Sequence, residues 1–192
     1  MVPRRIAIAR VVSIAAHPFA LALVLIGIAA AKLHGFGTAA QLVGLTSVVF
    51  VVPLWIFVWR KWRTRHWETV DASTPSNRPA LYTVALLLMA TLAAAIGLLR
   101  GWDPILRGCT GVAGMLAVAA VLNRWIKLSL HVAFAGFAAT VLLRLDWRLG
   151  AALALVVPLL AWSRLTLARH TWQEVLGGVC LGATAGALLI AL

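Results

Sequence analysis

Charged residues are scarce in this chain, and acidic residues are the scarcest of them. Only 11% of its 192 residues are charged, with 5 Asp and Glu against 17 Lys and Arg, while 63% are hydrophobic. A water-soluble domain cannot cover so much apolar surface, so this composition excludes a soluble globular protein. The few acids also argue against chemistry that needs several carboxylates around a divalent cation.

The chain has only two cysteines and no apparent internal repeat. Cys109 and Cys180 lie far apart in apolar, small-residue surroundings, without the close spacing of zinc or redox sites. We expect them to be inert core thiols. No paired inverted repeat is apparent, which argues against a transporter. The sequence predicts a single domain over residues 1–192.

Long apolar segments make up most of the chain. They cover residues 11–31, 42–59, 80–99, 105–122, 128–145, 149–163 and 174–192. About 20 apolar residues are needed to cross a bilayer, and the sixth segment is short. The predicted fold class is therefore all-α, a polytopic transmembrane bundle of six or seven helices. We interpret the first segment as a transmembrane helix, because it is longer than the apolar core of a typical signal peptide.

The net charge of +12 would suggest nucleic acid in a soluble protein. With no soluble basic domain, we expect no nucleic-acid partner, and the cations are typical of residues that flank membrane helices beside anionic headgroups. We expect a multi-pass protein of the cell (inner) membrane. Many ionisable residues occur in the connectors 60–79, 123–128 and 164–173, which share one membrane face if consecutive helices form hairpins.

The most informative polar segment is 163–174, which reads Ser-Arg-Leu-Thr-Leu-Ala-Arg-His-Thr-Trp-Gln-Glu. Ionisable residues between membrane helices are candidates for a functional site, because their burial must be compensated. Glu174 follows His170 by four residues, one helical turn, so its carboxylate can hold one imidazole nitrogen while the other faces a substrate. This pattern is typical of a histidine prepared as a nucleophile or base.

Two further motifs carry polar groups suited to phosphate. Arg78 ends a turn-rich loop before Pro79, which is well placed to begin a helix, and arginine offers a planar fork of donors. Lys127, Ser129 and His131 open an apolar helix, where helical spacing puts Lys127 and His131 on one face. Each motif alone fits a structural role as well as a functional one. A glycine stripe at Gly178, Gly182 and Gly186 predicts close packing of the last helix against a neighbour.

Together, the three polar motifs resemble those of the type-2 phosphatidic acid phosphatase and vanadium haloperoxidase superfamily, over about residues 71–190. The third family motif is Ser-Arg, five residues, His, three residues and usually Asp. It is matched here by Ser163, Arg164, His170 and Glu174. The second, Pro-Ser-Gly-His, corresponds to residues 128–131. The first, Lys, six residues, Arg-Pro, corresponds to residues 71–79.

The chain departs from the family pattern at several positions. Asp71 stands where the family has lysine, so one phosphate-binding cation is missing there. Leu128 and Leu130 replace Pro and Gly, which should make the helix start more regular. Glu174 replaces the usual Asp. We infer that Lys127 can supply the missing cation from another direction.

The resemblance implies a metal-independent hydrolysis of phosphate esters through a phosphohistidine, with no cofactor. His170, oriented by Glu174, would attack phosphorus, and His131 would protonate the leaving oxygen. The expected phosphate ligands are Arg78, Arg164, Lys127 and Ser129, and Asp71, Arg169 and Ser163 are further candidates. The expected protein is an integral membrane lipid phosphatase acting on a polyprenyl phosphate or diphosphate, or on phosphatidate-like lipids.

Alternatives stay open at this point. Asp71 at the lysine position favours a non-catalytic relative that binds a lipid phosphate, and His66, Glu68 and Asp71 suggest a metal-dependent hydrolase or prenyl transferase. The expected partners are a lipid phosphate and membrane lipids, and the sequence leaves open whether the chain forms a homo-oligomer. The excess of Lys and Arg favours a cytoplasmic site, whereas the family's better-known lipid phosphatases commonly work on the opposite face.

Overall fold

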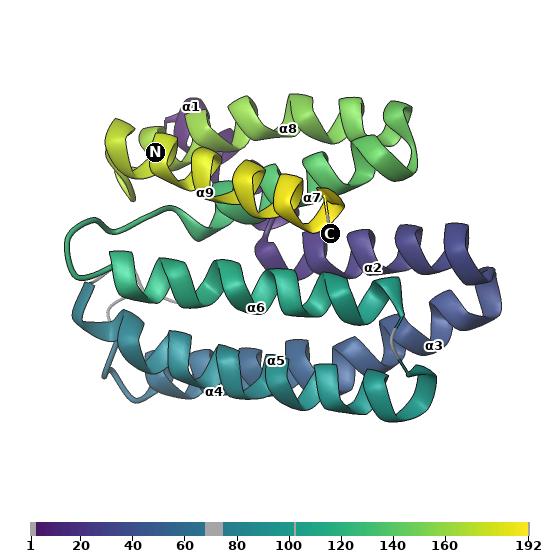
Figure 1. Cartoon of the computed structure of the whole chain (residues 1–192). Coiled ribbons are helices and arrows are strands. Elements are labelled where there is room, and N and C mark those ends of the chain that lie inside the picture. The colour runs from purple at the N-terminus through teal and green to yellow at the C-terminus, as the bar shows by residue number, and fades with distance from the viewer. Residues whose placement is uncertain (1–2, 68–74, 102, 192) are drawn as a thin grey trace. The chain divides into compact units, whose positions relative to one another are not determined.

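The computed structural model describes residues 3–67, 75–101 and 103–191, and over these ranges it contains helices and no strand. The α-helices are α1 (Arg4–Ala15), α2 (Pro18–His34), α3 (Phe36–Thr46), α4 (Val52–Arg63), α5 (Arg78–Arg100), α6 (Pro104–Leu122), α7 (Leu130–Leu145), α8 (Trp147–Thr166) and α9 (Trp172–Ala191) (Figure 1). A π-helical segment, η1 (Ser47–Val51), joins α3 to α4, and a 3-10 turn, η2 (Pro75–Asn77), precedes α5. The predicted all-α class is confirmed.

The helices are long and apolar enough to make this a membrane-embedded protein. Within the described ranges, five stretches qualify as spans: Phe36–Arg63, Arg78–Arg100, Pro104–Leu122, Trp147–Thr166 and Trp172–Ala191. The prediction that the sixth apolar segment is short is wrong, because α8 has 20 residues. Asp146 starts that helix earlier than expected, since its Oδ1 accepts the N–H groups of Arg148 (3.1 Å) and Leu149 (3.3 Å).

The first predicted helix is broken. α1 and α2 meet at a bend of 43°, and the pair passes as one span only when taken together. Pro18 explains the break, because proline has no N–H and disfavours helical geometry in the residue before it. α7 is a further apolar helix of only 16 residues.

The chain divides into two compact units. The terminal unit comprises Met1–Leu25 and Ile126–Leu192, and the central unit comprises Ile26–Trp125. In the central unit α5 packs against α6, and α4 and η1 pack along α5. In the terminal unit α7 packs against both α8 and α9, and α1 packs against α8. The single domain expected from the sequence stays a prediction.

α7 is the centre of the terminal unit. Every residue from 131 to 139 is buried, so this short helix is enclosed by protein along most of its length. The glycine stripe of α9 faces it, as predicted. A Cβ at Gly178 would lie 2.7 Å from the Ser129 carbonyl oxygen, one at Gly186 would lie 2.8 Å from Thr140 Cβ, and one at Gly182 would collide with the Ala133 carbonyl oxygen. The matching order of these contacts makes α7 and α9 parallel, so both helices begin at the same end.

Charged residues at helix ends of the central unit pair with one another. Asp103 caps α6 by accepting the Ile105 N–H (2.7 Å), and it pairs with Arg100 Nε (3.1 Å) and His34 Nε2 (3.0 Å). Burial by itself would raise the pKa of Asp103, but these three partners together hold it below its usual value. The cluster therefore joins the end of α2 to the α5–α6 turn.

The contact between α7 and α9 can be tested by adding one methyl group. Gly182→Ala should lower the free energy of unfolding by about 1–3 kcal/mol, because the new Cβ meets backbone atoms that cannot move aside. Gly108→Ala is the matched control, since nothing lies within 4 Å of its added Cβ. It should be neutral or stabilising by up to about 1 kcal/mol, from helix propensity alone. Unfolding in detergent measures both, and equal effects at the two positions would contradict the close packing.

Candidate active site

Two of the three predicted motifs come together at one end of the terminal unit, where α7 and α9 begin and α1 and α8 end. Ser129 N–H donates to the Glu174 carbonyl oxygen (3.0 Å), which ties the start of α7 to the first turn of α9. The Lys127 ammonium donates to the carbonyl oxygen of Arg169 (3.0 Å), which ties the segment before α7 to the α8–α9 turn. These hydrogen bonds join residues more than 40 positions apart.

The α8–α9 turn is a tight one with an unusual residue at its corner. Ala168 has a φ of 51°, the left-handed region. Its N–H donates to the Leu165 carbonyl (3.0 Å), and the Arg169 N–H donates to the Arg164 carbonyl (3.1 Å). This is the Schellman pattern, which usually has glycine at that corner, and an alanine there costs about 1–2 kcal/mol. The turn brings His170 back beside the end of α8.

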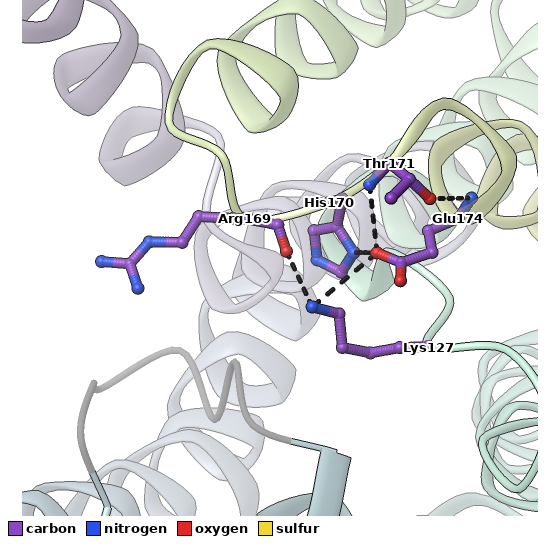
Figure 2. Close-up of polar contacts among 5 residues, drawn as sticks. All are labelled: Lys127, Arg169, His170, Thr171 and Glu174. Atoms are coloured by element: carbon purple, nitrogen blue, oxygen red, sulfur yellow. Dashed lines mark hydrogen bonds and ion pairs between the residues drawn. The ribbon is translucent and has the colours of Figure 1, made fainter.

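Glu174 is fixed by a capping box at the start of α9. Thr171 Oγ1 accepts the Glu174 N–H (3.4 Å), and Glu174 Oε2 accepts the Thr171 N–H (3.2 Å). The pattern Thr-x-x-Glu is the usual sequence for this reciprocal arrangement. The same carboxylate oxygen also accepts a hydrogen bond from His170 Nδ1 (2.8 Å) (Figure 2). One side chain therefore caps the helix and holds the histidine.

The predicted pairing of His170 with Glu174 is confirmed, although its basis differs from the expected one. α9 begins only at Trp172, so the pair is brought together by the capping turn rather than by one helical face. The His170 side chain is 2% exposed. Because Nδ1 faces a carboxylate, the neutral ring carries its proton there, and Nε2 carries the lone pair. A carboxylate in this position also stabilises the charged ring.

Lys127 lies at the site, but in the segment before α7 and not on a helical face as predicted. The interpretation that Lys127 and His131 share a face is wrong, because α7 begins at Leu130 and Ser129 is extended, with φ −78° and ψ 100°. The extended Ser129 donates its N–H to the Glu174 carbonyl oxygen of α9, outside its own helix. The Lys127 ammonium nevertheless lies 3.8 Å from Glu174 Oε2, next to the histidine (Figure 2).

The serine and arginine of the third motif are buried against α1. Ser163 Oγ donates to the Ala9 carbonyl oxygen (2.6 Å), so this serine joins α8 to α1. Arg164 is 1% exposed, and its Nη1 donates to Ser13 Oγ (2.8 Å). Arg169 differs from both, because its guanidinium points away from the His170 cluster in Figure 2 and only its carbonyl oxygen contacts Lys127.

The start of α7 contributes Ser129 and His131, which are both buried. Within the described residues Ser129 Oγ has no hydrogen-bond partner. An unsatisfied buried hydroxyl costs about 1–3 kcal/mol, so its retention beside the start of a helix suits a site that binds a polar ligand. The His131 ring meets the ring of His17 edge to face, with centroids 5.0 Å apart. The sequence analysis missed His17, and the His-Pro pair at a helix break was the signal that could have drawn attention to it.

The remaining predicted residues lie elsewhere. Arg78 is the first helical residue of α5, in the central unit, where it is buried with its guanidinium beside Tyr82. Pro79 follows it in the first turn, as predicted. The approach of Arg78 to the histidines stays a prediction. Asp71 and Glu68 lie outside the described residues.

The electrostatics of this end favour an anion. The helices α7 and α9 both begin there, and the dipoles of two helix N-termini attract negative charge. Lys127 and the buried Arg164 add two positive side chains. Comparison with known protein families, with curated proteins and with solved structures found no match for this chain.

The capping box predicts a specific order of stability among variants of Thr171. Thr171→Ala should lower the free energy of unfolding by about 1 kcal/mol, because the Glu174 N–H loses its acceptor. Thr171→Ser keeps the hydroxyl and should retain most of that stability. Unfolding of both variants in detergent makes the comparison, and equal losses would show that the hydroxyl does not cap α9.

Proposed function

We propose that this protein is an integral membrane lipid phosphatase that hydrolyses a phosphomonoester or diphosphate of a lipid through a phosphohistidine at His170. The observation that carries the proposal is the buried His170–Glu174 pair (2.8 Å), set beside the Lys127 ammonium at the start of two helices. The resemblance of the three motifs to the type-2 phosphatidic acid phosphatase superfamily supports the same reaction.

The first step is attack on phosphorus. His170 Nε2 supplies the electron pair, a P–N bond forms, and the P–O bond to the lipid breaks. The ring becomes positively charged, and the Glu174 carboxylate at Nδ1 stabilises that charge. His131 donates a proton to the leaving oxygen, which departs as an alcohol or, from a diphosphate, as a lipid monophosphate.

The second step releases phosphate. His131, now neutral, accepts a proton from water as the water oxygen attacks phosphorus. The P–N bond breaks and its electron pair returns to His170. In both steps the equatorial phosphoryl oxygens carry the developing charge, and positive groups held in place stabilise it. Lys127, Arg164 and the N–H groups at the start of α7 are the groups of the terminal unit that fit this task. The role of Arg78 as a further phosphate ligand stays a prediction from the sequence.

The substrate class follows from the location of the site. It lies at the ends of helices that are long and apolar enough to span a membrane. A lipid phosphate presents its charged group at the membrane interface and keeps its tail in the bilayer, so polyprenyl phosphates, polyprenyl diphosphates and phosphatidate-like lipids fit. We propose that no metal takes part, since a histidine nucleophile and fixed cations supply what the reaction needs. The excess of Lys and Arg favours a site on the cytoplasmic face of the cell membrane.

The test is release of phosphate from these lipids by the purified chain in detergent. His170→Ala should lower kcat by at least about a thousandfold, because the nucleophile is lost. His66→Ala is the matched control, since His66 is an exposed histidine whose ring bonds Thr64 Oγ1 (2.8 Å), and it should retain activity.

Three results would count against the proposal. Turnover by His170→Ala at the wild-type rate would exclude the phosphohistidine. Tight binding of a lipid phosphate without release of phosphate would favour the non-catalytic relative, for which Asp71 at the lysine position is the main argument. Loss of activity with a chelator would favour the metal-dependent alternative.

A further inference from the structure

The last turn of α1 and the break that follows it contact the candidate site at two separate points. Ser13 lies in that last turn, and His17 lies in the break between α1 and α2. Ser13 Oγ accepts a hydrogen bond from Arg164 Nη1 (2.8 Å). The His17 ring packs edge to face on His131, at an interplanar angle of 84°. These partners come from α8 and α7, and neither Ser13 nor His17 belongs to the motifs that resemble a family.

The surroundings of Ser13 show that this contact is built into the fold. Ser13 and Ala9 form the buried face of α1, whereas Val11 and Ile14 are 65% and 73% exposed. The Ala9 carbonyl accepts the Ser163 hydroxyl on the same face. A buried guanidinium must be surrounded by acceptors, and a serine hydroxyl satisfies one of its N–H groups without neutralising its charge. Ser13 therefore orients Arg164 without neutralising its charge.

His17 is held in one orientation by the break between α1 and α2. Its carbonyl oxygen accepts the Leu21 N–H (3.0 Å), and its ring Nδ1 accepts the Phe19 N–H (3.3 Å). The Phe19 ring packs against it, with centroids 4.6 Å apart. Because Nδ1 accepts a hydrogen bond from a backbone N–H, the neutral ring carries its proton on Nε2. This hydrogen bond holds the His17 ring in its orientation against His131, and a ring without Nδ1 would lose it.

We propose that the end of α1 completes the active site, with His17 as a positioning residue for His131 and Ser13 as a positioning residue for Arg164. This inference rests on the proposed phosphatase reaction. The two residues act on different parts of that reaction. His17 acts through the proton donor, and Ser13 acts through a cation that holds the oxygens of the phosphoryl group.

The two roles predict different responses to the leaving group. Assays of the full-length chain in detergent would compare a lipid phosphate, whose alkoxide must be protonated, with an aryl phosphate, whose phenolate leaves without a proton. His17→Phe keeps an aromatic ring against His131 but removes both nitrogen atoms. It should lower kcat for the lipid phosphate by about tenfold or more, and for the aryl phosphate by less than about twofold. Ser13→Ala should lower kcat/KM for both substrates by a similar factor, since both carry the same phosphoryl oxygens.

Ile14→Ala is the matched control, because Ile14 is on the same turn of α1 and faces away from α8. It should leave both rates unchanged. An equal loss on the two substrates in His17→Phe would overturn the role of His17, because a merely structural change affects both leaving groups alike. Unchanged kcat/KM in Ser13→Ala would overturn the role of Ser13.

A second measurement separates this inference from the proposed function. In protein labelled with ¹⁵N-histidine, His17→Phe should shift the imidazole signals of His131, identified by their loss in His131→Asn. Ile14→Ala should leave them in place. If the wild-type chain hydrolyses neither substrate but His17→Phe shifts these signals, the phosphatase proposal fails and the positioning contact stands. Signals that do not move would overturn the positioning of His131 by His17, with or without activity.

Discussion

The close packing of α7 on α9 is the interaction on which the rest of the site depends. Three glycines of α9 leave no side chain at the points where the two helices approach most closely, and the Gly182 backbone lies against the Ala133 carbonyl. In a membrane, helices associate through such tight packing, because the surrounding lipid is as apolar as the helices. Since the helices are parallel, their N-termini meet at one end. The hydrogen bond from Ser129 to the Glu174 carbonyl then joins them there.

One carboxylate makes this junction suitable for chemistry. Glu174 Oε2 accepts from the Thr171 N–H and from His170, with the Lys127 ammonium nearby. Glutamate is a usual residue at the N3 position of a capping box, because its length lets it reach back to the cap residue. The longer side chain thus fits the local structure where the resembled family usually has Asp. The left-handed Ala168 belongs to the same turn, and strained residues of this kind are typical of functional sites.

The polar groups of the terminal unit satisfy one another across long separations in sequence. Arg164 and Ser163 are buried, and both find partners on α1, roughly 150 residues earlier in the chain. Burying an arginine without such partners would cost several kcal/mol. The first helix is therefore needed to accommodate the third motif, which gives a physical reason for its short, broken form at the Pro18 bend.

The sequence by itself determined the features that depend on local patterns. Hydropathy located the helices, the spacing of Gly178, Gly182 and Gly186 indicated a tight contact, and the spacing of His170 and Glu174 predicted their pairing. Only tertiary contacts place Lys127, since α7 begins after the extended Ser129 and the Lys127 ammonium bonds the Arg169 carbonyl oxygen of the α8–α9 turn. The tertiary structure also brought Ser13 and His17 to the site. No local pattern predicts the contacts of Ser13 with Arg164 and of His17 with His131. Each joins residues more than 100 positions apart and forms only when the first helix packs on its neighbours.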